Sequence, residues 1–84
     1  MQIFLHISQV EPEDTLSEMK DHGLEFETVS VEADMMNGSS IVTVSVSDLS
    51  EFLNKLNAIK DENEYELEML SAVLDDEDNC HFEY

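Results

Sequence analysis

Hydrophobic and polar residues alternate along four segments of the chain, and this period of two predicts four β-strands. In the first segment Ile3, Leu5 and Ile7 share one face, and the residues between them share the other. The second segment changes phase midway, which predicts a bulge or twist near Thr28. Asn37-Gly38 indicates a tight hairpin between the second and third segments. The four segments are residues 2–8, 24–33, 41–46 and 63–70, and residues 71–74 can extend the last one.

Two other segments have the pattern of helices. The first lies between Pro12, which suits an opening helical turn, and Gly23, which suits a helix end, and Leu16 and Met19 form a short apolar stripe. The second occupies residues 47–63, where Asp48 and Glu51 have the spacing of a capping box. Its apolar face consists of Leu49, Phe52, Leu53, Leu56 and Ile59.

The resulting order of elements is β-α-β-β-α-β, which predicts an α+β fold. We expect a ferredoxin-like sandwich, in which a four-stranded antiparallel sheet carries two helices on one face. Right-handed crossovers place both helices on that face and leave the other face of the sheet open. Residues 1–74 would form this single domain, and residues 75–84 would be an acidic C-terminal segment that is at most partly ordered.

Charge is the unusual feature of the composition. Twenty-one Asp and Glu residues face three lysines and no arginine, which gives a formal net charge of -18. Such a surface repels nucleic acid and anionic lipid and attracts basic protein surfaces, so we expect a basic protein partner and neither direct nucleic-acid nor membrane binding. Hydrophobic residues make up 42% of the chain, enough for a folded core. Without a signal peptide or a membrane span, and with Cys80 as the one cysteine, we expect a cytoplasmic protein.

Acidic residues recur at every second position in two of the predicted strands. If the apolar residues that alternate with these acids face the helices, the carboxylates line the open face about 6.8 Å apart. Regularly spaced carboxylates can offer Lys and Arg side chains the contacts that they make with phosphates. The candidate partner-binding residues are Glu64, Glu66 and Glu68, then Glu25 and Glu27, and Asp75, Asp76, Glu77 and Asp78 in the C-terminal acidic run.

Simpler interpretations of these features remain open. Charges protect edge strands from aggregation, and alternating Glu is common on a solvent-exposed face. The run at Asp75–Asp78 is also consistent with solvated acid. Met35 and Met36 in the hairpin loop either form an adaptable contact with a partner or include one residue that packs on the sheet edge.

The sequence shows little sign of other chemistry. His6, His22, Cys80 and His81 lack the spacing of a structural zinc site, and the acidic run does not match a calcium-binding loop. Nucleophile motifs and phosphate-binding loops are missing as well. We therefore expect no metal, no cofactor and no enzymatic activity.

In size and composition the chain resembles the small acidic DNA-mimic proteins with which phages block restriction, CRISPR and other nucleic-acid-binding systems. The resemblance implies an inhibitor of a basic DNA- or RNA-binding defence protein or nuclease, acting in the host cytoplasm if a phage encodes it. An immunity protein or antitoxin for a basic toxin nuclease is one alternative. A ferredoxin-like subunit that oligomerises or binds a small ligand through its open face is another, and a homodimer is compatible with each of the three.

Overall fold

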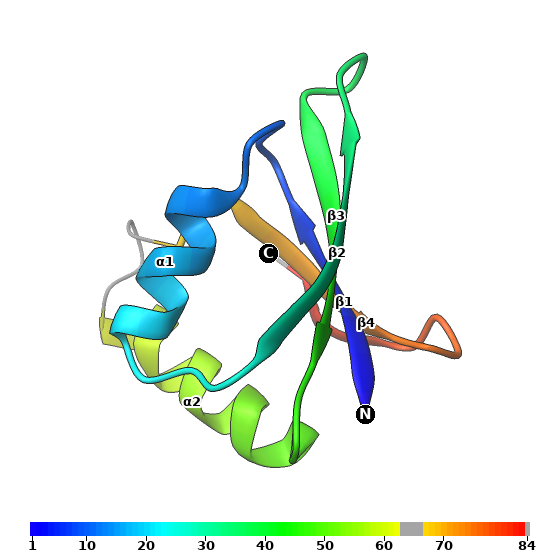
Figure 1. Cartoon of the computed structure of the whole chain (residues 1–84). Coiled ribbons are helices and arrows are strands. Elements are labelled where there is room, and N and C mark those ends of the chain that lie inside the picture. The colour runs from blue at the N-terminus through cyan, green and yellow to red at the C-terminus, as the bar shows by residue number, and fades with distance from the viewer. Residues whose placement is uncertain (63–66, 84) are drawn as a thin grey trace.

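In the part of the chain that the structure describes, five antiparallel strands form one sheet and two helices cover one of its faces (Figure 1). This computed structural model describes residues 1–62 and 67–83. The elements are β1 (Gln2–Ile7), α1 (Glu13–Asp21), β2 (Glu27–Asp34), β3 (Ser39–Ser45), α2 (Leu49–Glu62), β4 (Leu70–Asp75) and β5 (Cys80–Glu83). Across the sheet the strands lie in the order β2-β3-β1-β4-β5. The predicted small α+β domain with two helices and an antiparallel sheet is therefore confirmed.

Apolar residues alternate along the two central strands, β1 and β3, and they are buried under the helices as the sequence predicts. Ile3, Leu5 and Ile7 of β1 are fully buried, and so are Val42 and Val44 of β3. Ile3 lies opposite Val44 and Leu5 opposite Val42, so the two strands present one continuous apolar surface to the helices. Burying these side chains supplies the main favourable term for folding.

Local sequence signals mark the beginning of α2 and the end of α1. Asp48 Oδ1 accepts a hydrogen bond of 3.1 Å from the backbone N–H of Glu51 and so caps α2. After α1 the chain turns through Gly23, whose φ of +94° belongs to the left-handed region that glycine adopts without strain. Each helix packs its apolar side against the sheet through residues that include Met19, Phe52, Leu56 and Ile59.

The predicted number of four strands is wrong, because the C-terminal residues add β5 at the edge of the sheet. In this pairing Val73 of β4 lies opposite Phe82, and Ala72 lies opposite Glu83. Phe82 also packs against the buried core. Within the expected acidic segment 75–84, Asp75 thus ends β4 and Cys80–Glu83 form a strand.

The strand expected over residues 63–70 begins later than predicted. Residues 67–69 form a turn, in which the Leu70 N–H donates to the Leu67 carbonyl oxygen at 3.1 Å, and β4 starts at Leu70. The physical reason is that Leu67 and Met69 pack into the core from a turn, so their alternation does not mark a strand. Leu67 still reaches the core, where its side chain is fully buried. Glu64 and Glu66 lie outside the described residues.

The bulge expected near Thr28 is confirmed. The register between β2 and β3 shifts between Thr28 and Ser30, so Val29 is the extra residue. Every residue of β2 is exposed, including Val29 and Val31, although their spacing suggested a buried face. The β2–β3 hairpin extends past the helices in Figure 1, so its far part has no layer to pack against.

Candidate acidic interaction surface

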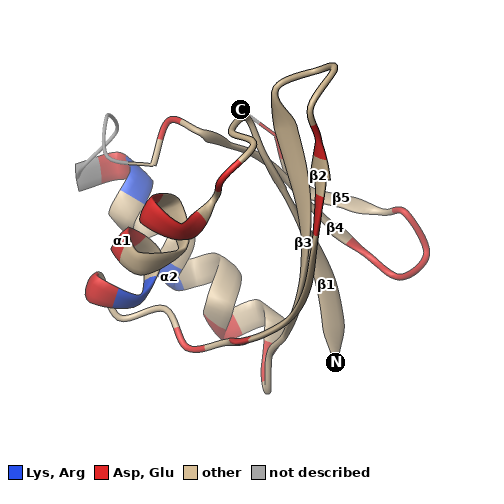
Figure 2. Cartoon of the chain, turned by 45° about the horizontal axis from the view of Figure 1, so that its top comes forward, with Lys and Arg blue, Asp and Glu red and all other residues tan. Residues whose placement is uncertain are grey.

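Carboxylates are spread over most of the described surface. Of the Asp and Glu side chains that the structure describes, all are exposed except Asp75, which is buried, and Glu18, which is half-buried. Figure 2 shows acidic segments on both helices, on β2 and on the loop between β4 and β5. The basic segments in the same view lie on the two helices. The sheet and its loops therefore present negative charge without a basic neighbour on the same element.

The three lysines contact other groups of the protein instead of lying free among the carboxylates. Lys20 Nζ lies 5.0 Å from the centre of the Phe26 ring, and Lys60 Nζ lies 4.7 Å from the centre of the Phe82 ring. Lys55 Nζ lies 3.4 Å from Glu51 Oε1 in an exposed pair one helical turn apart. Three lysines against twenty-one Asp and Glu residues neutralise only a small part of the charge.

The bulge in β2 gathers three carboxylates on one face of the sheet. Without an extra residue, Glu27 would point away from the side on which Glu32 and Asp34 lie, because alternate residues of a strand face opposite sides. With Val29 as the extra residue, all three fall on the face opposite the helices, which we call the open face. Their partners on β3 are Ser45 for Glu27, Ile41 for Glu32 and Ser39 for Asp34. These three carboxylates form what we call the β2 carboxylate row.

The hairpin tip, residues 35–38, is held by Asp34. Its Oδ1 accepts hydrogen bonds of 3.2 Å from the backbone N–H groups of Met36 and Asn37, and its Oδ2 accepts one of 2.6 Å from Asn37 Nδ2. The side chain and backbone of Asn37 are the main causes that lower the pKa of Asp34 below 3.8. Asp34 therefore stays ionised while it fixes the conformation of the tip.

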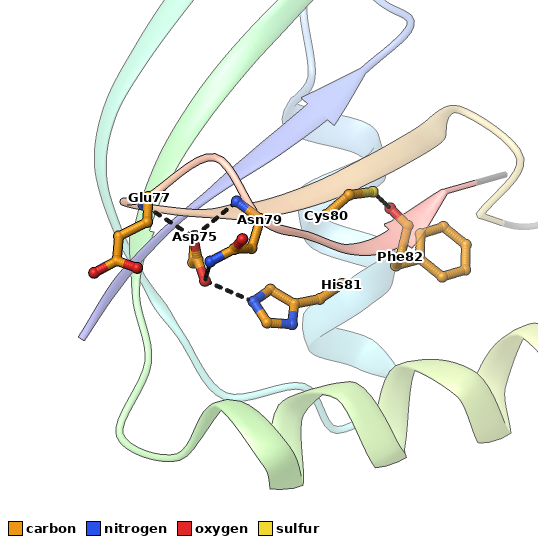
Figure 3. Close-up of polar contacts among 6 residues, drawn as sticks. All are labelled: Asp75, Glu77, Asn79, Cys80, His81 and Phe82. Atoms are coloured by element: carbon orange, nitrogen blue, oxygen red, sulfur yellow. Dashed lines mark hydrogen bonds and ion pairs between the residues drawn. The ribbon is translucent and has the colours of Figure 1, made fainter.

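Asp75 holds the turn between β4 and β5 in the same way. Its Oδ2 lies 2.9 Å from His81 Nε2 and accepts a bond from Asn79 Nδ2, while its Oδ1 accepts backbone bonds from Glu77 and Asn79 (Figure 3). The bond from His81, followed by those from Asn79 and Glu77, holds the pKa of Asp75 far below its ordinary value. Unlike Asp34, Asp75 is also buried, so it is a poor contact for a partner.

The other predicted site residues are placed as follows. Glu25 is exposed in the connection before β2, Glu27 is the first residue of β2, and Glu68 is exposed in the turn before β4. Asp76, Glu77 and Asp78 lie with Asn79 in the exposed loop between β4 and β5. Glu68 therefore does not belong to a strand, which corrects its expected position in a strand over residues 63–70.

Sequence reasoning missed Glu32 and Asp34, although a signal for them was present. A bulge near Thr28 was predicted, and one extra residue moves the positions after it to the other face. Counting from the bulge would have placed both carboxylates on the same face of the sheet as Glu27.

The centre of the open face is weakly polar. Phe4, His6, Thr43 and Ser45 are half-buried on it, as the sequence predicts for the two central strands, and Leu74 is half-buried on β4 beside Phe4. His6 and Ile41 line an open depression of about 440 Å³ that also includes Glu32, Asp34 and Asn37. A neutral centre with the β2 carboxylate row along one margin therefore makes up this face.

Within residues 1–62 and 67–83, no group of three or more His, Cys, Asp or Glu side chains is arranged to hold a metal ion. None of the helices described in those ranges has the length and apolar character needed to cross a membrane.

Comparison of the chain with protein-family models, with curated proteins and with solved structures gives no match.

Proposed function

We propose that the protein is an acidic mimic of nucleic acid, which binds a basic DNA- or RNA-binding protein and blocks it. The observation that carries the proposal is the set of exposed carboxylates over a surface whose lysines are engaged in contacts of their own. Such a field draws in basic surfaces from a distance and repels nucleic acid. A defence protein or nuclease of a phage-infected bacterium is the kind of target that this chemistry suits, in the host cytoplasm.

The β2 carboxylate row supports the proposal with a geometry. Glu32 and Asp34 are two residues apart, or about 6.8 Å along the strand, and Glu27 follows after roughly 13 Å because its β3 partner is four residues from that of Glu32. These spacings are about two and four times the ~3.4 Å rise per nucleotide in one DNA strand. A guanidinium group binds carboxylate and phosphate alike, so a row with these spacings can occupy a phosphate-binding track.

An immunity protein for a basic toxin nuclease would use the same contacts. It differs in its partner, which would be a toxin encoded beside it, and a neighbouring toxin gene separates the two cases. Both functions predict competition between this protein and nucleic acid for one basic site.

A second candidate function, self-association through the open face, is favoured by the weakly polar centre of that face, where Phe4 and Leu74 are half-buried and Ile41 is 39% exposed. A homodimer formed there would bring two strongly negative molecules together, so its association should strengthen as salt screens the repulsion. Binding to a basic partner should instead weaken with salt, and sedimentation at two salt concentrations separates the two.

We also propose that β1 to β4 and the two helices form a ferredoxin-like unit, to which β5 adds an edge strand. The order β2-β3-β1-β4 with antiparallel neighbours supports this assignment. On this fold both helices lie behind the sheet and the open face remains accessible to a partner.

The proposal is tested by isolating a partner and then removing charge at chosen places. The tagged protein is used to capture partners from bacterial lysate, which are eluted with a salt gradient, and the retained protein is purified. Glu27→Gln/Glu32→Gln removes two charges from the row, and Glu13→Gln/Asp21→Asn removes two exposed charges from α1 as a matched control. Each replacement is isosteric and exposed, so all variants should keep the wild-type melting temperature.

We expect the row variant to bind the partner about tenfold more weakly, which corresponds to about 1.4 kcal/mol, and the α1 variant to change affinity by much less. Equal small losses for both variants would remove the row from the mechanism and leave a general electrostatic attraction. A captured partner that binds nucleic acid unhindered while in the complex, or the capture of no specific partner, would contradict the proposed function itself.

A further inference from the structure

The hairpin tip exposes two methionines that have no role in the core. Met36 is 98% exposed and Met35 is 81% exposed. One interpretation of the sequence was that one of them packs on the sheet edge, and these exposures exclude that contact for both. Exposing two large apolar side chains side by side at a protruding tip is unfavourable in water, so their presence calls for a binding role.

The tip is also held in one conformation before any partner arrives. Asp34 accepts three hydrogen bonds from Met36 and Asn37, and Gly38 takes a φ of +66°, which glycine adopts without strain. Asp34 lies opposite Ser39 at the last pair of the β2–β3 ladder, so the loop contains only residues 35–38. A short loop fixed by its own hydrogen bonds loses little entropy on binding.

Charge next to the tip indicates the chemistry of the partner. The carboxylates of Glu32 and Asp34 follow β2 to the base of the tip, so anionic groups directly precede the apolar tip along the chain. A second copy of this chain would bring like charges together at this place, which disfavours it. The complementary surface has an apolar platform beside basic side chains.

Sites for single-stranded nucleic acid have that combination. In them, aromatic side chains stack against unpaired bases while Lys and Arg contact the phosphates. Methionine makes favourable contacts with aromatic rings through its sulfur. Surfaces that bind a duplex contact phosphates and the edges of paired bases in the grooves, so stacking platforms are not their main feature.

We propose that the β2–β3 hairpin enters the single-strand-binding groove of the partner, where Met35 and Met36 occupy aromatic platforms in place of bases and the β2 carboxylate row occupies the phosphate track. This inference rests on the proposed function and names the type of site that the mimic blocks.

The test uses the full-length protein and the purified partner. Met35→Ser/Met36→Ser removes the apolar contact, and Met35→Leu/Met36→Leu keeps most of it. The affinity of each variant is measured over a series of salt concentrations, together with that of Glu27→Gln/Glu32→Gln. Unchanged melting temperatures establish that the exposed tip variants fold.

We expect the serine variant to bind at least tenfold more weakly at every salt concentration, with an unchanged slope of log affinity against log salt. The leucine variant should recover most of the affinity. The row variant should instead reduce the slope, because that slope counts ionic contacts. Wild-type affinity in the serine variant would overturn the role of the tip.

Displacement by nucleic acid separates the two levels of the proposal. An oligothymidylate and a duplex of equal length are titrated against the complex. Displacement by the single strand at much lower concentration supports the inference. Displacement by the duplex alone overturns the inference and leaves the proposed function standing, and displacement by neither contradicts both.

Discussion

The side chain of Ser40 is fully buried, and its hydroxyl group makes no hydrogen bond with any of the described residues. It lies on the helix side of β3, opposite Ile7 of β1 and Ala33 of β2, in line with Val42. A buried hydroxyl without a partner loses its hydrogen bonds to water and regains nothing, at a cost of about 1–3 kcal/mol. We therefore expect Ser40→Ala to stabilise the protein.

The magnitude follows from two opposing terms. Removing the oxygen recovers at least about 1 kcal/mol of desolvation cost. The vacated space of roughly 10 Å³ costs about 0.2 kcal/mol, at about 24 cal/mol per Å³ of cavity. The net gain of about 1 kcal/mol should raise the melting temperature by about 4–8 °C for a domain of this size.

The assay is thermal and urea unfolding followed by circular dichroism. Ser45→Ala is the matched control, because Ser45 lies on the same strand but is half-buried and points to the open face. It should change stability by less than about 0.5 kcal/mol. If Ser40→Ala lowers stability, the hydroxyl has a partner and the packing of β3 against the helices differs from the one described.

Three further predictions concern the C-terminal hairpin. Phe82→Ala should destabilise the protein by about 2 kcal/mol, since the ring is only partly buried, and should speed hydrogen exchange in β4; wild-type stability would mean that β5 is not docked. Asp78 has a φ of 62°, which glycine adopts with less strain. Asp78→Gly should therefore raise the free energy of unfolding in urea by about 0.5–1 kcal/mol. A lower free energy of unfolding would mean that the Asp78 side chain makes a stabilising contact. Asp75→Ala should lower the melting temperature at neutral pH. Because the folded-state pKa of Asp75 is lowered, the stability contributed by its ionised form is complete above the ordinary value of 3.8 and lost as pH falls towards the folded-state pKa. The difference from wild type should therefore shrink over that window, and a constant difference would refute the role of the charge.

The elements that the sequence predicts well are those in which burial decides the pattern. β1 and β3 cross the middle of the sheet, so each second residue must be apolar, and their alternation is clear. α2 shows its apolar face for the same reason. The change of phase near Thr28 predicted the bulge in β2, and the Asn37-Gly38 pair predicted the turn between β2 and β3.

The elements that were missed depend on contacts from distant parts of the chain. β5 is only four residues long. The loop before it has Asp78 in the left-handed region, where glycine is the usual signal of a turn in a sequence. The start of β4 was misplaced because Leu67 and Met69 reach the core from a turn, and their alternation has the same period as a strand. At edges and ends of this kind, tertiary packing overrides local pattern.

The acidic character of the surface follows from the composition, but the positions of its carboxylates do not. Charge alone led us to expect a basic partner, which stays a prediction, and the strand register places Glu27 on the open face, as expected. To predict the full β2 carboxylate row, one must know which residue is the extra one in the bulge, because a shift by one position moves a side chain to the other face. The exposure of Met35 and Met36 could not be derived from the sequence, because it depends on how far the hairpin extends past α1.

The central claim, that this protein occupies a nucleic-acid-binding site, is tested most directly by asking whether a ternary complex forms. The purified partner is saturated with fluorescent nucleic acid, and this protein is titrated in at low salt while anisotropy and complex mass are recorded. We expect the nucleic acid to be released in step with binding and no species to contain all three components. A stable ternary complex with undiminished anisotropy would contradict it.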